Sequence, residues 1–353
     1  MLAQSDRFQD RERIPSLDIV RSVAAVSVLL IHCSAHGFVG NVGSAEWLGA
    51  LFWASISRAG VPLFFMCSGA LLLGEGHSGS FSRIAKRLRR IMIALFFWAF
   101  VYKLYRLSQD WGFCPESLLQ SVKEVFLFRH ERHLYYLHIL LLAYLLLPLV
   151  DAMINKGHIL VRYTLVLWFI FGILYPTVLP FWPFTLLRGI PLQWEINMTY
   201  ASTGYMLLGY SLLHKPLKLR FCFGSAVSGS VMIFAGTLWL SEEVGELRQH
   251  FFEGMSIGAC LLAAGLFSLI VRLAGERRDR GPGCKLFETV SRSSFCVYLL
   301  HPLALSLLAD AGICVDQGPV FLTIPLFALL LLGITMLIWL LLSKVPIANR
   351  WLI

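Results

Sequence analysis

Ten long apolar runs restrict this chain to one class of fold. Each run is close to the roughly 20 residues that a helix needs to cross a bilayer. Backbone polar groups inside a bilayer must be satisfied within the chain, so such runs fold as helices. The runs cover residues 17–38, 47–73, 91–107, 134–154, 159–179, 196–213, 221–240, 254–273, 294–313 and 320–342. We therefore predict an all-α, polytopic membrane protein with about ten transmembrane helices.

The composition agrees with a membrane protein and excludes an ordinary soluble domain. Hydrophobic residues make up 57% of the chain and charged residues only 14%, whereas soluble domains carry about 25% charged residues. The mean hydropathy is +0.70. The formal net charge of +9 would suit a nucleic-acid partner only if the basic residues formed one patch. They are instead divided among the loops, so no nucleic-acid partner is expected.

The basic residues indicate how the chain is oriented. Most of them fall in alternate segments, at residues 1–16, 83–90, 156–162, 215–220, 272–292 and 344–350. The opposite loops hold only Lys123, Arg129, Arg132, Arg188 and Arg248. Because basic loops remain in the cytosol, both termini are predicted to be cytosolic. No loop is long enough for a soluble domain, so residues 1–353 are expected to form a single membrane domain with residues 1–16 as a cytosolic segment.

The first run, residues 17–38, carries ionisable groups that are costly in a bilayer. In a helix, Arg21 and His32 lie about three turns apart, nearly on one face and about 16 Å apart along the axis. Such residues usually face a bundle interior or a wet cavity. Asp18 is expected to orient Arg21 across one turn. The alternative is that Arg21 extends to the cytosolic edge and His32 is a satisfied core histidine.

Two later stretches add a candidate binding site. Small residues and a proline, such as Pro62 and Gly69, interrupt the second run, which suits either a cavity or simple helix packing with a kink. After this run, basic residues recur at spacings of three or four, so a short helix would present them on one side. They are Arg83, Lys86, Arg87 and Arg90. This cluster could anchor the topology or contact anionic lipid. Together with Arg21 it could instead grip a polyanion.

Several motifs occur along the chain, most of them within or next to the apolar runs. The first run holds an Arg-x10-His pair, the second reads GVPLFFMCSG, and an Arg-x-Arg pair follows at Arg87 and Arg89. Further along, the chain reads HLYYLHILLLAYLLLPL from residue 133, TYASTGYMLLGYS from residue 199 and SSFCVYLLHP from residue 293. In this order, the motifs resemble those of the acyltransferase-3 family of integral membrane enzymes. Within that family the chain is most similar to the stand-alone type that O-acetylates cell-surface polysaccharides.

This resemblance implies an activity and roles for particular residues. It implies transfer of an acyl group, usually acetyl, from cytosolic acyl-CoA to a hydroxyl of a surface polysaccharide or lipid-linked sugar. Acetyl-CoA would be the co-substrate, and no metal is expected. Arg21 and His32 match the essential pair of the family, while Arg87 and Arg89, with the adjacent Arg90, would hold the CoA phosphates. His32 would act as general base, a role that suits an imidazole near neutral pH.

Other residues are further candidates, each with a plain structural alternative. Ser68, Tyr298 and His301 are candidate donors to an oxyanion, although tyrosine and histidine at helix ends also serve as interfacial anchors. Three residues, His36, His133 and Glu195, are candidate contacts to the acceptor, or else ordinary loop and interface residues.

The main alternative interpretation is a secondary transporter or a flippase of lipid-linked sugar. Ten spans with polar groups near the middle of the membrane would suit a transporter or a flippase as well as an enzyme. Transporters commonly repeat their broken helices, yet the Arg21 and His32 pattern has no counterpart in the later runs. The expected partners are membrane lipid and a glycan or lipid-linked sugar acceptor. The resemblance implies the inner membrane of a bacterial cell, spanned many times.

Overall fold

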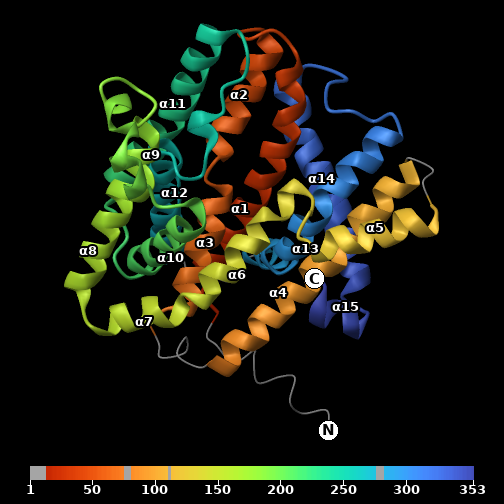
Figure 1. The fold of residues 1–353 in the computed structure, drawn as a ribbon, viewed down its shortest axis with the longest axis horizontal. Helices are drawn as coiled ribbons and strands as arrows, with labels where there is room; N and C mark the ends of the chain where they lie inside the picture. The colour runs from red at the N-terminus through yellow and green to blue at the C-terminus, as the bar shows by residue number, and fades with distance from the viewer. Residues whose placement is uncertain (1–12, 75–80, 110–112, 276–281) are drawn as a thin grey trace.

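The computed structural model describes residues 13–74, 81–109, 113–275 and 282–353, and every regular element in these ranges is helical (Figure 1). The prediction of an all-α fold is therefore confirmed. Most of the predicted cytosolic segment 1–16, and residues 276–281 of the basic segment 272–292, lie outside the described residues.

The elements follow one another as helices joined by short 3₁₀ or π-helical turns. In chain order they are α1 (Pro15–Ser34), η2 (Ala35–Val39), α2 (Ala45–Ser57), α3 (Gly60–Leu72), α4 (Phe81–Gln109), α5 (Pro115–Phe126), η3 (Arg132–Leu134), α6 (Tyr135–Leu145), α7 (Leu147–Asn155), α8 (His158–Trp168), η4 (Phe169–Leu174), α9 (Tyr175–Val178), η5 (Phe184–Arg188), η6 (Ile190–Trp194), α10 (Met198–His214), α11 (Leu219–Val244), η7 (His250–Phe252), α12 (Ile257–Gly275), α13 (Pro282–Asp310), α14 (Val320–Leu342) and α15 (Pro346–Trp351).

All ten predicted apolar runs are largely helical. Eight helical stretches of the described chain are long and apolar enough to cross a membrane. A ninth candidate is the pair α6 and α7, which is bent by 46°. The remaining run corresponds to α10, which has 17 residues and is shorter than the roughly 20 needed for a straight crossing. The number of ten spans and the cytosolic position of both termini stay predictions.

Two local expectations differ from the structure. The second apolar run is two helices, because α2 ends at Ser57 and α3 begins at Gly60, with Arg58 and Ala59 in a turn between them. The basic cluster after this run does not form a short separate helix. It occupies the first turns of α4, which continues for 29 residues. The basic side chains therefore extend directly from a membrane helix.

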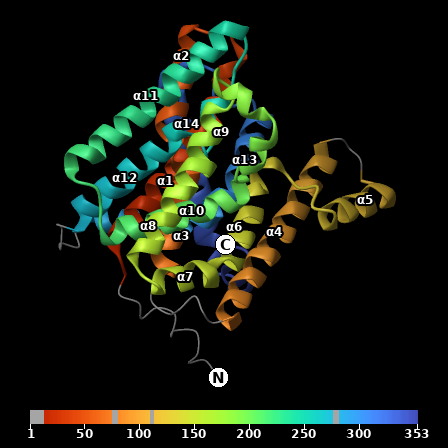
Figure 2. The same ribbon diagram turned by 60° about the vertical axis from the view of Figure 1, so that its left-hand side comes forward.

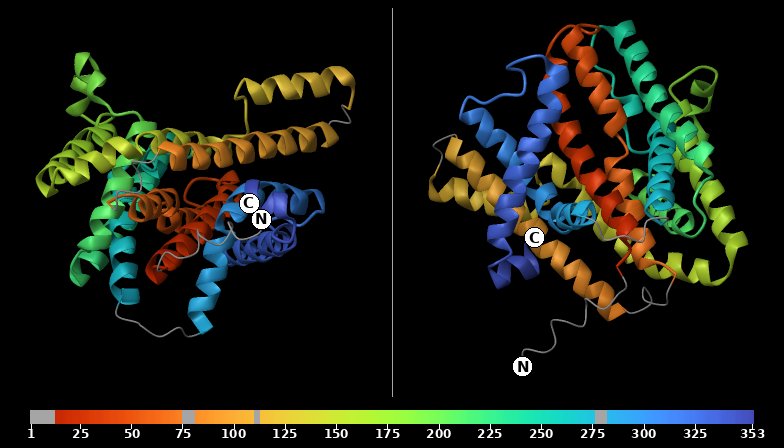
Figure 3. Two further views of the ribbon diagram at one scale, coloured as in Figure 1. Left: turned by 90° about the horizontal axis from the view of Figure 1, so that it is seen from below. Right: turned by 180° about the vertical axis from the view of Figure 1, so that it is seen from behind.

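Helix α1 lies at the centre of the bundle (Figures 1 and 2). It contacts α2, α3, α12, α13 and α14. Its small residues Ala24 and Ala25 are almost fully buried, so neighbouring helices can approach closely. Pro15 occupies the first turn, where its missing N–H costs no hydrogen bond. In contrast, α4 lies along one side of the bundle, with α5 beside it on the outside (Figure 3).

Helices α3 and α10 cross with their backbones in contact. A Cβ atom at Gly69 would lie 1.9 Å from the carbonyl oxygen of Met206, and one at Gly209 would lie 2.2 Å from that of Met66. Each glycine therefore faces the backbone of the other helix, which no larger residue allows. This crossing fixes α3, the helix that carries Phe64 and Ser68, against the rest of the bundle.

Candidate functional site

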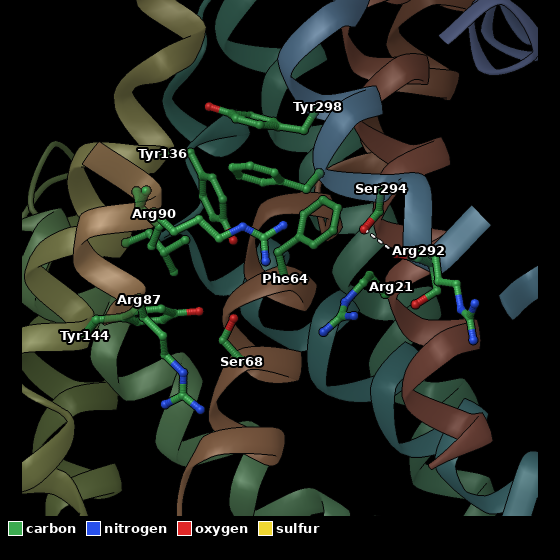
Figure 4. Close-up of a pocket in the computed structure, with 14 residues that line it drawn as sticks. Arg21, Phe64, Ser68, Arg87, Arg90, Tyr136, Tyr144, Arg292, Ser294 and Tyr298 are labelled. Atoms are coloured by element: carbon green, nitrogen blue, oxygen red, sulfur yellow. Dashed lines mark hydrogen bonds between the residues drawn. The ribbon is translucent and has the colours of Figure 1, made fainter. Parts of the chain in front are cut away.

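Two cavities of similar volume lie next to each other inside the bundle. The first, which we call the arginine cavity, has a volume of about 400 Å³ (Figure 4). It is lined by Arg21, Phe64, Ser68, Arg87, Arg90, Ile91, Tyr136, Leu140, Tyr144, Ser291, Arg292, Ser294, Phe295 and Tyr298. The second, which we call the histidine cavity, has a volume of about 390 Å³. It is lined by Val28, Ile31, His32, Ala35, Phe38, Arg58, Val61, Pro62, Phe64, Arg132, His133, Tyr135, Tyr136, Leu247, Gln249, Phe252, Gly254 and Tyr298.

The arginine cavity collects guanidinium groups from three helices. Arg21 comes from α1, Arg87 and Arg90 from α4, and Arg292 from α13. Figure 4 shows Arg21 and Arg87 at the end of the cavity away from Tyr298, with Arg90 closer to Phe64. Arg292 forms an ion pair with Glu288 at 2.7 Å, and Arg90 donates a hydrogen bond to the backbone oxygen of Ile353. Since no carboxylate is among the lining residues, the cavity is strongly cationic.

Helical geometry determines which of the predicted basic residues reach this cavity. Successive residues in an α-helix are about 100° apart, so Arg87 and Arg90 lie near one face and Arg89 nearly opposite Arg87. Arg89 is exposed, and its guanidinium lies 4.8 Å from the centre of the Trp351 ring. The structure therefore brings Arg87 and Arg90 to Arg21 but leaves the predicted Arg89 outside the cavity.

Asp18 does not orient Arg21, contrary to our expectation. Its carboxylate accepts hydrogen bonds from Arg13 Nε at 2.7 Å and from Ser291 Oγ at 2.7 Å. Ser22 Oγ also donates to the carbonyl oxygen of Phe287 at 2.9 Å. Asp18 thus joins the start of α1 to α13, because partners outside α1 occupy its carboxylate. The Arg21 guanidinium lines the arginine cavity instead.

The histidine cavity brings imidazole rings from three parts of the chain together. His32 comes from α1 and His133 from η3, and both line the cavity. His301 of α13 is fully buried behind them, and its ring centre lies 4.5 Å from that of His32 and 6.1 Å from that of His133. Although three imidazoles meet here, the described residues contain no cluster of three or more His, Cys, Asp or Glu side chains placed to hold a metal ion.

The proline after His301 determines how this imidazole is held. Pro302 has no N–H, so the carbonyl oxygen of Tyr298 has no helical donor four residues later. His301 Nδ1 takes that place, at 2.8 Å from the Tyr298 oxygen. A carbonyl oxygen only accepts, so Nδ1 carries the proton and, in the neutral ring, Nε2 is an acceptor. That Nε2 atom is buried and has no hydrogen-bond partner in the described chain.

A tyrosine from α4 completes the hydrogen bonding at the same break in α13. Tyr102 Oη donates to the carbonyl oxygen of Leu299 at 2.7 Å and accepts from the N–H of Leu303 at 3.3 Å. It thereby bridges a donor and an acceptor that would bond directly in a regular helix. Its ring also packs 4.7 Å from the ring of His133. Sequence analysis did not single out Tyr102, because its role depends on a contact between distant helices.

Three aromatic residues, Phe64, Tyr136 and Tyr298, line both cavities and so form a shared wall. The ring centres of Phe64 and Tyr136 are 6.0 Å apart, and those of Tyr136 and Tyr298 are 5.2 Å apart. The hydroxyl of Tyr298 donates to the backbone oxygen of His133. Arg21 and His32 therefore lie on one helix but in different cavities, with only side chains between them.

Four predicted acceptor or oxyanion contacts have clear positions. Ser68 lines the arginine cavity and His133 lines the histidine cavity. His36 is exposed and does not line either cavity, because α1 ends at Ser34 and the chain turns into η2. Glu195 is exposed where the backbone extends after η6 and is likewise at neither cavity.

Arg58, to which sequence analysis assigned no role, lines the histidine cavity. It lies at the turn between α2 and α3. The only sequence signal was a basic residue two positions before the GVPLFF stretch, and that signal does not specify which way the side chain points.

Comparison with known proteins identifies the family. The sequence model of acyltransferase family 3, described as an acyltransferase domain, matches residues 14–344. No curated protein and no solved structure matches the chain. The match covers nearly the whole chain, including both cavities and the helices that line them. The chain therefore belongs to the acyltransferase-3 family and is a membrane acyltransferase.

Proposed function

We propose that this protein moves an acetyl group from cytosolic acetyl-CoA to a hydroxyl of a cell-surface polysaccharide or a lipid-linked sugar. The observation that carries the proposal is the pair of adjoining cavities. One is rich in guanidinium groups and the other contains imidazoles, and they share a wall of aromatic side chains. A donor with an anionic head and a thin reactive arm suits such a pair.

The arginine cavity would bind the CoA phosphates. Arg21, Arg87 and Arg90 approach one space from two helices, and guanidinium groups match phosphate oxygens in a two-pronged geometry. The pantetheine arm would then pass the wall formed by Phe64, Tyr136 and Tyr298 and present the thioester in the histidine cavity. The adenine-bearing end would remain at the face from which α4 begins.

His32 would act as the general base. It would take the proton of the acceptor hydroxyl while that oxygen attacks the thioester carbonyl carbon. A C–O bond forms, the C–S bond breaks, and the CoA thiolate leaves and receives a proton. No nucleophilic serine or cysteine is needed, because the thioester is already activated. Such a base contributes roughly 10² to 10⁴ in rate.

His301 would position His32. Its buried Nε2 can accept a hydrogen bond, and its ring lies next to that of His32. Bonding to one nitrogen of His32 would leave the other nitrogen unprotonated and facing the acceptor. In this tautomer His301 cannot donate to an oxyanion, and the Tyr298 hydroxyl is engaged with the His133 backbone. Ser68 lies in the other cavity.

The loop charges support the direction of transfer. The arginine cavity is lined by the first turns of α4, which belong to the predicted cytosolic segment 83–90. Arg132, in a predicted outer loop, lines the histidine cavity. Acetyl-CoA would therefore enter from the cytosol, and the acceptor would meet His32 from the outer face of a bacterial inner membrane.

The test is an acetyl-transfer assay on purified protein with labelled acetyl-CoA and a panel of glycans and lipid-linked sugars. His32→Ala should lower transfer by roughly 10² to 10⁴, with acetyl-CoA binding retained. His158→Ala is the matched control, since His158 is exposed at the start of α8. Equal transfer by wild type and His32→Ala would remove the general-base role.

The alternative is a secondary transporter or a flippase of lipid-linked sugar. A transporter would move its solute without consuming acetyl-CoA. Reconstituted vesicles can therefore separate the two functions, because movement of a sugar that needs no acetyl-CoA and survives His32→Ala would contradict the enzyme. The family match and the two unlike cavities favour the acyltransferase.

A further inference from the structure

Arg58 is an enclosed cation that the reaction described above does not use. It lines the histidine cavity together with His32. The centre of its guanidinium lies 3.8 Å from the centre of the Phe252 ring. Its Nε is enclosed by protein and makes no hydrogen bond within the described residues. The aromatic contact offsets part of the cost of enclosing this charge, but the hydrogen-bonding capacity of the group remains unfilled.

The other groups lining the cavity do not neutralise this charge. Arg132 also lines it, and no aspartate or glutamate is among its lining residues. Glu131, the acid next to Arg132 in sequence, pairs with Arg106 instead. No ion pair of Arg58 or Arg132 was found in the described chain. The histidine cavity therefore carries two guanidinium groups without a counter-ion on its lining.

A ligand that carries a permanent negative charge explains this arrangement better than the oxyanion that forms only briefly during the reaction. Removing a charge from water without a partner is expensive, so the enclosed Arg58 gains most when the ligand brings the opposite charge. Arg132 is exposed and adds positive charge at the rim. The planar guanidinium can hold a carboxylate or a phosphate through two parallel hydrogen bonds. An uncharged sugar would leave the Arg58 group unsatisfied.

We propose that the histidine cavity selects an acceptor that carries an anionic group, bound by Arg58 with Arg132 at the rim, while the hydroxyl to be acetylated lies at His32. The proposal rests on the acetyl transfer proposed above. The anionic group is either the carboxylate of an acidic sugar or the diphosphate of a lipid-linked sugar. The cavity volume of about 390 Å³ falls in the range of small-molecule sites.

Equilibrium binding tests this proposal independently of catalysis. The ligands are a neutral oligosaccharide, the matching oligosaccharide with one uronic acid, and the neutral sugar on a polyprenyl diphosphate. Polyprenyl diphosphate alone serves as a further probe. We expect wild type to bind at least one anionic acceptor 10-fold or more tightly than the neutral one. The acceptor that gains this affinity distinguishes a sugar carboxylate from a lipid diphosphate.

Substitution of Arg58 assigns the effect to this residue. Arg58→Gln should weaken binding of the preferred anionic acceptor about 10- to 100-fold and raise its KM in the transfer assay. Binding of the neutral acceptor and of acetyl-CoA should be unchanged. Arg58→Lys should restore part of the affinity. Arg188→Gln, an exposed basic residue of η5, is the matched control and should behave as wild type. Elution as a single species with intact acetyl-CoA binding shows that each variant is folded.

Three results would overturn the proposal. The first is equal or absent binding of all acceptors by wild type. The second is unchanged acceptor binding in Arg58→Gln. The third is a fall in kcat of Arg58→Gln that is the same for every acceptor and for hydrolysis of acetyl-CoA, which would assign Arg58 to stabilising the reacting oxyanion. If anionic acceptors bind through Arg58 but no acetyl group is transferred, the binding site stands and the proposed transfer fails.

Discussion

The arginine cavity and the histidine cavity have nearly the same volume, about 400 and 390 Å³, yet they differ in the chemistry they offer. Guanidinium groups in the first carry a fixed charge at any physiological pH. Imidazoles in the second can gain and lose a proton in that range. The first cavity is therefore suited to holding an anionic donor, whereas the second can also move a proton. The comparison shows that one bundle can separate affinity from chemistry by placing them along a single helix, α1.

This comparison predicts that variants of the two cavities affect different kinetic constants, and the largest effect on affinity should come from the arginine cavity. Arg21→Gln or Arg87→Gln should weaken acetyl-CoA binding about 10- to 150-fold, because a charge-assisted hydrogen bond contributes about 1.5–3 kcal/mol. Turnover at saturating donor should change little. Titration calorimetry and transfer kinetics measure the two quantities.

Acetyl-pantetheine, which lacks the nucleotide, is the matched ligand for this experiment. Wild type and the arginine variants should bind it with similar affinity, since it removes the groups that the cavity would hold. If the variants weaken acetyl-pantetheine as much as acetyl-CoA, or leave acetyl-CoA binding unchanged, the arginine cavity does not bind the phosphates.

A second prediction concerns the helix that supports both cavities. Gly69→Ala should lower stability by about 1–3 kcal/mol through overpacking, because its Cβ would lie 1.9 Å from the Met206 oxygen. Since α3 contributes Phe64 to both linings, donor and acceptor binding should fall together. A thermal melt in detergent measures the loss of stability.

The matched control for the α3 contact is Gly333→Ala. Gly333 lies in α14, and a Cβ there would meet no atom within 4 Å. Its melting temperature should not fall, because alanine is the better helix former. A Gly69→Ala protein as stable as wild type would contradict the close backbone contact with α10.

The fold was largely predictable because apolar runs of membrane length have few alternatives to a helix. Arg21 and His32 could be placed on one helix for the same reason. The direction in which a side chain points from its helix was harder to predict. The Arg89 guanidinium lies over Trp351, which comes from the far end of the chain, and the Arg58 guanidinium lies over Phe252, almost 200 residues away in sequence. These positions depend on contacts between distant segments, which local spacing does not contain.

The third prediction uses that difference in direction. Arg90→Gln should weaken acetyl-CoA binding about 10-fold, since Arg90 lines the arginine cavity and one charge-assisted bond lost is worth roughly this factor. Arg89→Gln should leave binding within about 2-fold of wild type, because its guanidinium lies over Trp351. Both substitutions remove one positive charge from the same helix. The opposite ranking would mean that the donor approaches α4 from the other side.

The smallest effect is expected at the break in α13, where it would be confined to the histidine cavity. Tyr102→Phe removes the hydroxyl that bridges the carbonyl of Leu299 and the N–H of Leu303. A hydrogen bond contributes about 0.5–1.5 kcal/mol net, so kcat should fall about 2- to 10-fold as the backbone next to His301 loses support. The acetyl-CoA affinity should stay constant, because Tyr102 does not line the arginine cavity. Tyr163→Phe, at an exposed site on α8, controls for loss of a hydroxyl. Should Tyr102→Phe instead weaken acetyl-CoA binding with kcat intact, the break in α13 would support the donor site, and the division of labour between the two cavities would be incorrect.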